Sequence, residues 1–382
     1  MDRWWIVLLC LFFAGCATQR HALPEPQTLF EDRYFAPRPV PAAADVFAVS
    51  ADMKRYLRDH IAHRLGWHDK ALELVRALRG ETELKLAYDA TKTRTAAEAF
   101  DDRAGNCLSL VIMTGALAQE LDLGVRYYHV LMADVWSRDG DLLLANQHVN
   151  LSIANRAVNR RSGEGDFRLT VDFLPPEELY RLVRSEIDEN TVIAMFLNNR
   201  AAEHLVARRL DDAYWSARAA IEADRSFLPA YNTLGVVYLR DHRFAEAERV
   251  LAVAATLEPE NPQIMSNLEL VYRGEGRTAA ADQLAARRVR IEPVPPYHYL
   301  TQALDAMRGG DYAAARDLLQ RELKREPYNH EVLFALAVAS ANLGNVKEAR
   351  RYLTMARDTS TTRRSREIYT AKLELLRSVR VQ

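Results

Sequence analysis

A regular repeat determines the architecture of the second half of this 382-residue chain. From Ala194 onward the sequence divides into five consecutive units of 34 residues, with no insertion between them. The units begin at Ala194, Leu228, Pro262, Pro296 and His330. The twentieth position of every unit is an alanine: Ala213, Ala247, Ala281, Ala315 and Ala349. A small side chain at the same place in each unit lets two helices approach closely, so the period predicts a stack of helical hairpins.

The repeat resembles the tetratricopeptide repeat, which has small residues at its eighth and twentieth positions and a proline near its end. The eighth positions hold Ala201, Gly235, Glu269, Ala303 and Ala337, and the prolines are Pro259, Pro293 and Pro327. The resemblance implies an all-α superhelix over residues 194–363, followed by a capping helix over residues 364–382. Superhelices of this kind bind proteins or peptides on their concave face, so we expect a protein partner there.

Three residues depart from the repeat pattern. Arg200 and Gln302 stand at positions that are usually apolar, and Glu269 stands at a small position. We therefore expect the first, third and fourth units to pack imperfectly at these places.

The N-terminus carries a targeting signal. The apolar run from Trp4 to Ala14 is too short to span a bilayer and has the length of a signal-peptide core. It leads into Phe13-Ala14-Gly15-Cys16, which resembles the signal of bacterial lipoproteins. The resemblance implies that residues 1–16 are a signal peptide with a lipidated Cys16. Because Ala17 rather than aspartate follows, it also implies a lipid anchor in the outer membrane, facing the periplasm.

The segment after this signal is rich in proline. Five prolines lie between Leu23 and Pro41, and proline disfavours helix. We expect residues 17–45 to form an extended tether.

Residues 46–190 do not repeat and predict an α+β domain. Helices are expected over residues 51–66, 70–78 and 96–101, and a fourth, apolar helix over residues 107–121. Strands are expected over residues 125–136, 142–153 and 167–173. Gly105 and Asn106 interrupt the preceding structure, so Cys107 would begin the apolar helix. Free backbone N–H groups and the helix dipole favour a thiolate there.

Three residues of this segment have the types that thiol catalysis requires. A nucleophile, a base and a group that orients the base occur in chain order as Cys107, His148 and Asp172. His129 is a rival base, and Asp134 and Asp166 are rival orienting acids. The remaining histidine cluster, His60, His63 and His68, lacks nearby ligands in a metal-binding pattern and is expected on a helix surface.

The same segment resembles the transglutaminase-like superfamily of papain-type cysteine enzymes over about residues 95–176. The resemblance rests on Gly105-Asn106-Cys107, Leu123-Gly124-Val125-Arg126, His148-Val149 and Val171-Asp172-Phe173. It implies that Cys107 is the nucleophile, His148 the base and Asp172 the residue that orients the base. Family members of bacteria are commonly peptidases or amide acyltransferases. Val149 replaces the aromatic residue that often follows the histidine, which bears on substrate specificity.

Two functional hypotheses follow. The first is an outer-membrane-anchored cysteine enzyme that acts on amide bonds of peptides or proteins, with its repeats docking a partner or substrate. The alternative is a non-catalytic, lipid-anchored scaffold in which the repeats mediate protein–protein interaction. Neither hypothesis needs a cofactor or a metal. The 51 basic and 52 acidic residues leave a net charge of -1, without the basic surface that nucleic-acid binding requires.

Overall fold

The structure, a computed structural model, describes residues 23–64, 66–79, 84–139, 142–156, 168–173 and 183–378. The expected signal peptide and Cys16 lie outside these residues. Within the described part of the chain, no helix combines the length and apolar character needed to cross a membrane.

The middle segment is an α+β domain whose helices and strands lie close to the expected positions. Its helices are α2 (Ala43–Val46), α3 (Ala51–His60), α4 (Trp67–Leu78), α5 (Ala96–Asp102) and α6 (Cys107–Glu120). Its main sheet is antiparallel, in the order β5-β4-β3-β6. The strands are β3 (Leu123–Asp139), β4 (Leu142–Asn155), β5 (Leu169–Val171) and β6 (Val183–Ile187).

Three strands were not expected from the sequence. β6 is only five residues long, with polar residues between Val183 and Ile187, and its first four residues are exposed, so its sequence carries too weak a strand pattern to be recognised. β1 (Ala87–Tyr88) and β2 (Ala104–Gly105) form a short parallel ladder that is too brief for any periodic signal. This ladder lies immediately before Cys107, the first residue of α6.

The repeat region is helical, as predicted, and keeps its spacing. The first helices of the five units are α8 (Glu189–Val206), α10 (Leu228–Arg240), α12 (Pro262–Gly274), α14 (His298–Arg308) and α16 (His330–Asn342). The second helices are α9 (Leu210–Ala223), α11 (Phe244–Leu257), α13 (Thr278–Ile291), α15 (Tyr312–Arg325) and α17 (Val346–Asp358). α18 (Arg363–Ser378) follows them. The alanines at the twentieth positions are all 0% exposed, which explains why a small side chain recurs there.

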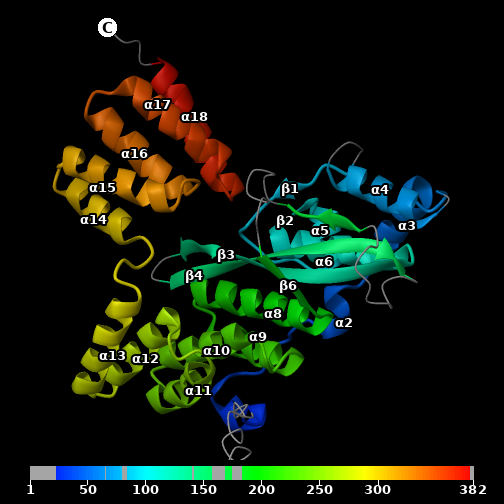
Figure 1. The fold of residues 1–382 in the computed structure, drawn as a ribbon, viewed down its shortest axis with the longest axis horizontal. Helices are drawn as coiled ribbons and strands as arrows, with labels where there is room; N and C mark the ends of the chain where they lie inside the picture. Colours follow the sequence, from blue (N-terminus) through cyan, green and yellow to red (C-terminus); the bar gives the residue numbers. More distant parts are fainter. Residues whose placement is uncertain are drawn as a thin grey trace, which may run out of the picture.

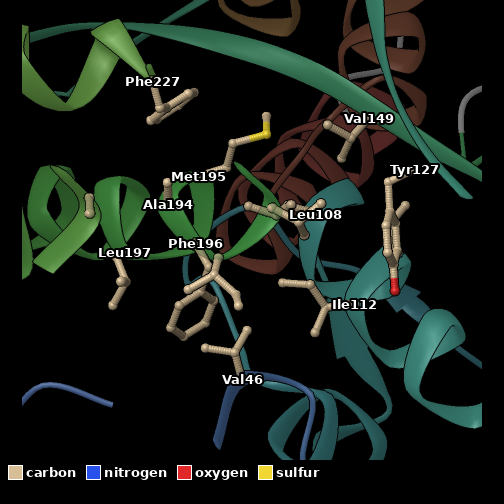
Figure 2. Packing of buried hydrophobic residues seen from close by; sticks show 14 of the residues in the cluster. Val46, Leu108, Ile112, Tyr127, Val149, Ala194, Met195, Phe196, Leu197 and Phe227 are labelled. Carbon is tan, nitrogen blue, oxygen red and sulfur yellow. The ribbon is translucent and has the colours of Figure 1, made fainter. Parts of the chain in front are cut away.

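The hydrophobic core does not divide where the repeats begin. One cluster of buried side chains runs from Leu29 through the α+β domain to Val271 in the third unit. α8 joins the two parts, because Phe196 packs in the same cluster as Leu108 of α6 and Val149 of β4 (Figure 2). Buried side chains therefore pack continuously across residues 190–194, where the sequence predicted a domain boundary.

A division lies instead between the third and fourth units. The fourth unit, the fifth unit and α18 have a separate buried cluster, drawn yellow to red in Figure 1. The connection from α13 to α14 contains Pro293, Pro295 and Pro296, which interrupt helical hydrogen bonding. The guanidinium of Arg325 donates to the carbonyl of Val294 at 2.9 Å and to that of Pro295 at 3.3 Å.

The proline-rich segment differs from the expected tether. Over residues 23–41 it lies along the first two repeat units and includes the short 3₁₀ helices Pro26–Leu29 and Asp32–Tyr34. The rings of Phe35 and Tyr214 stack at 4.1 Å, and the hydroxyl of Tyr238 donates to the carbonyl of Leu29 at 2.9 Å. The prolines limit this segment to short 3₁₀ turns, and the apolar Leu29 and Phe35 between them provide the face that packs on the repeats.

Tyr214 is the main polar anchor of this docked segment. Its hydroxyl donates to Asp32 Oδ1 at 2.6 Å and accepts from the backbone N–H of Glu31 at 2.8 Å. We expect Tyr214→Phe to lower the free energy of unfolding by about 1–3 kcal/mol, since it leaves a partly buried N–H unpaired. Urea unfolding followed by circular dichroism measures this change. Tyr328→Phe, at a residue 59% exposed, is the matched control and leaves stability unchanged; equal stability of both variants would contradict the anchoring role.

Candidate functional site

Cys107 is the first residue of α6 and is partly exposed as a free thiol. Asn106 caps this helix, since its Oδ1 accepts from the N–H and from the hydroxyl of Ser109, both at 2.8 Å. A Cβ at position 105 would lie 2.7 Å from Cβ of Ser109, so the close approach of β2 to α6 requires glycine. The Gly-Asn-Cys sequence thus places the thiol at the open end of a helix.

The cap is itself held by residues from outside the helix. Asn106 Nδ2 donates to Oγ1 of the buried Thr93 at 2.9 Å. The backbone N–H of Thr93 donates to Glu203 Oε1 of α8 at 2.5 Å, and Arg200 Nη1 donates to the Thr93 carbonyl at 3.3 Å. Arg200, which departs from the repeat pattern, therefore contacts the segment that supports Cys107. The arginine at this usually apolar position thus makes a contact between the first repeat helix and the α+β domain, and is not a packing defect.

His148 and Asp172 form a close pair beside Cys107. His148 Nε2 lies 2.8 Å from Asp172 Oδ1, and the two side chains are 7% and 3% exposed. The Cys107 side chain lies close enough to His148 to raise the pKa of its imidazole. The structure thus brings together the three residues that the sequence nominated.

Asn150 completes the surroundings of Asp172. Its Nδ2 donates to Asp172 Oδ2 at 2.8 Å, so both carboxylate oxygens have partners. His148 and Asn150 are two residues apart on β4 and share one face of the strand. The buried Oδ1 of Asn150 has no hydrogen-bond partner among the described residues.

Opposing effects set the protonation of His148. Burial lowers the pKa, but the hydrogen bonds with Asp172 and Cys107, and negative charge on both, raise it to about 9. Because the folded-state pKa exceeds the ordinary 6.5, this group stabilises the fold fully below about pH 6.5. That stabilisation is lost as the pH rises through about 9.

The other histidines and acidic residues considered from the sequence either lie away from Cys107 or fall outside the residues that the structure describes. His129 pairs with Val149 in the β3–β4 ladder, whereas His148 pairs with Val130, so the two histidines point to opposite faces. Asp166 lies outside the described residues, as does the side chain of Asp134. His60, His63 and His68 are exposed. Within the described residues, no group of three or more His, Cys, Asp or Glu side chains could hold a metal ion.

Three residues near Cys107 were not predicted from the sequence: Thr93 and Asn150, described above, and Tyr88, which pairs with Gly105 of β2. Asn150 carried a usable signal, because strand alternation places it on the same face as His148. Thr93 and Tyr88 gave none, since only the folding of the 84–95 segment against α6 and α8 brings them near Cys107.

Comparisons with known proteins identify the repeats. The tetratricopeptide repeat model matches residues 300–362, in the fourth and fifth units. Similar solved structures include MamA, with 16% identity, a TM-score of 0.24, and coverage of 42% of this chain and 93% of that one. A tetratricopeptide protein of Thermus thermophilus shares 18% identity, with a TM-score of 0.29 and coverage of 47% and 98%. PilF of Pseudomonas aeruginosa shares 16%, with a TM-score of 0.28 and coverage of 50% and 89%.

No curated protein matches the chain. The family match at residues 300–362 shows that the chain contains a tetratricopeptide-repeat region. Such repeats generally bind protein partners. The comparisons support a role in protein–protein interaction for this region.

The cap at Asn106 has a testable effect on Cys107. Asn106→Ala removes the acceptor for Ser109 N–H and is expected to destabilise the protein by about 0.5–2 kcal/mol. It should also slow alkylation of Cys107 by iodoacetamide, because the thiol loses its fixed place at the helix end. The matched control is Asn329→Ala, which removes the equivalent cap of α16 in the separate second cluster. Equal alkylation rates in both variants would contradict the positioning role of Asn106.

The protonation of His148 can be followed directly. In histidine-labelled protein, nuclear magnetic resonance should show His148 titrating with a midpoint near 9. Asp172→Asn removes the negative acceptor and should move this midpoint to lower pH. Asp282→Asn, an exposed carboxylate in the third unit, should leave the midpoint unchanged. An unshifted midpoint in Asp172→Asn would contradict the assigned cause.

Proposed function

We propose that this chain is a cysteine enzyme of the transglutaminase-like type, acting on amide bonds of peptides or proteins. The observation that carries the proposal is the convergence of Cys107 at a helix N-terminus with the buried His148–Asp172 pair. A carboxylate with both oxygens bonded, beside a histidine that faces a partly exposed thiol, is the arrangement that nucleophilic catalysis requires.

The chemistry proceeds in two half-reactions. The thiolate of Cys107 attacks the amide carbonyl carbon and forms a C–S bond, and the tetrahedral intermediate then releases the amine as its C–N bond breaks. His148 in its protonated form gives its proton to that amine. Water, or a second amine, then attacks the thioester while His148 takes up one of its protons, and the Cys107 thiolate leaves. Asp172 holds the imidazole in place and stabilises its charged form.

The repeats would bring a protein partner or protein substrate to this site. The docked segment at residues 23–41 covers part of the first two units, so the partner is proposed to bind the remaining units. Exposed apolar side chains there include Leu270, Val289 and Leu304. On the basis of the lipoprotein-like sequence at Cys16, we propose that the protein lies in the bacterial envelope, anchored by lipid in the outer membrane and facing the periplasm.

The second candidate is a lipid-anchored scaffold without catalysis. The match of residues 300–362 to the tetratricopeptide repeat favours it, because these repeats generally bind proteins and need no reactive centre. In this case Cys107, His148 and Asp172 would be structural, and the repeats alone would carry the function.

One experiment separates the two candidates. The wild-type protein and Cys107→Ser are incubated with a proteolytic digest, and mass spectrometry records cleaved or newly formed amide bonds. The enzyme hypothesis expects products from the wild type, and a loss of at least about 100-fold in Cys107→Ser, the scale on which nucleophile removal acts. Identical product spectra, together with Cys107 alkylation no faster than that of N-acetylcysteine, would overturn it and leave the scaffold.

A further inference from the structure

Tyr88 lies beside Cys107 although it is 19 residues earlier in the chain. It is paired with Gly105 in the β1–β2 ladder, and the N–H of Asp89 donates to the Gly105 carbonyl at 3.0 Å. This pairing brings Tyr88 to the start of α6, two residues from Cys107 in the facing strand, and its phenol lies near the backbone N–H of Cys107. The phenol thus meets the same N–H that would face a reacting carbonyl oxygen.

The turn that follows Tyr88 is held from two sides. Arg94, a buried arginine, donates from Nη2 to Asp89 at 2.9 Å and from Nε to Asp102 at 2.7 Å. On the other side, the N–H of Ala90 donates to the carbonyl of Thr361, between α17 and α18, at 3.0 Å. Tyr88 is therefore placed by a braced turn.

The Tyr88 hydroxyl is a hydrogen-bond donor at neutral pH. Desolvation raises the pKa of Tyr88, and negative charge on Cys107 raises it further. The side chain is nevertheless 39% exposed, so the ring borders solvent beside the thiol. A substrate that reaches Cys107 would pass this ring.

We propose that the Tyr88 hydroxyl, together with the backbone N–H of Cys107, binds the oxyanion formed when Cys107 attacks an amide carbonyl. The inference rests on the proposed cysteine chemistry and adds its side-chain oxyanion donor. In the free protein the phenol lies near the Cys107 N–H. In the reaction the carbonyl oxygen takes the place between them and accepts from both, without proton transfer. Donors fixed before reaction stabilise the developing charge most effectively.

The experiment compares two reactions of the same thiol. Acylation of Cys107 by p-nitrophenyl acetate passes through an oxyanion, whereas alkylation by iodoacetamide is a displacement that forms none. In Tyr88→Phe the ring remains and only the hydroxyl is lost. We expect acylation to slow about 100-fold, the scale on which a single oxyanion donor acts, with alkylation unchanged. Tyr328→Phe, at an exposed repeat residue, is the control and leaves both rates unchanged.

Each outcome decides the proposal. Equal acylation rates in the wild type and Tyr88→Phe would overturn the role of Tyr88 and leave the cysteine chemistry standing. Parallel slowing of both reactions would mean that Tyr88 places the thiol rather than binding an oxyanion, which also overturns the proposal. A wild type that is alkylated rapidly but never acylated would overturn the proposed enzyme and this inference with it. Alkylation measured on the same sample reports whether the variant has kept the fold around Cys107.

Discussion

The hydrogen bond from the Thr93 backbone to Glu203 links the segment that supports Cys107 to the first repeat helix. Thr93 in turn binds Asn106, and Asn106 caps the helix that begins with Cys107. Each bond in this chain is buried or partly buried, where an unpaired partner is costly. The position of the thiol therefore depends on a helix that belongs to the repeats, and the two parts of the protein act as one structural unit.

Continuity of the core leads to the same conclusion. α8 starts at Glu189 and lies between the main sheet and α9 (Figure 1). Its buried side chains belong to the cluster shared by the α+β domain and the first repeat hairpin. The fourth and fifth units, with α18, form their own cluster, yet they touch the turn beside Tyr88 through Thr361. The end of the fifth unit therefore contacts the segment that carries Tyr88.

Much of the site was predictable from local pattern. Gly105 and Asn106 mark a helix start, so the place of Cys107 followed from capping chemistry. His148 and Asp172 stood within predicted strands, and strand alternation separates His148 from the rival His129. Asn150 was open to the same argument. Tyr88 and Thr93 were not, since the segment that carries them has no period and is placed only by long-range hydrogen bonds.

The sequence by itself determined the repeats, because a 34-residue period with alanine at each helix crossing is a local packing rule repeated five times. It also determined the helix start at Cys107, the strand that carries His148 and the strand that ends just before Asp172. Only the tertiary structure decided that the proline-rich segment docks on the repeats and that the core continues through α8. Only it placed Tyr88 beside the thiol. These features depend on contacts between residues far apart in the chain, which no periodic pattern in a single sequence encodes.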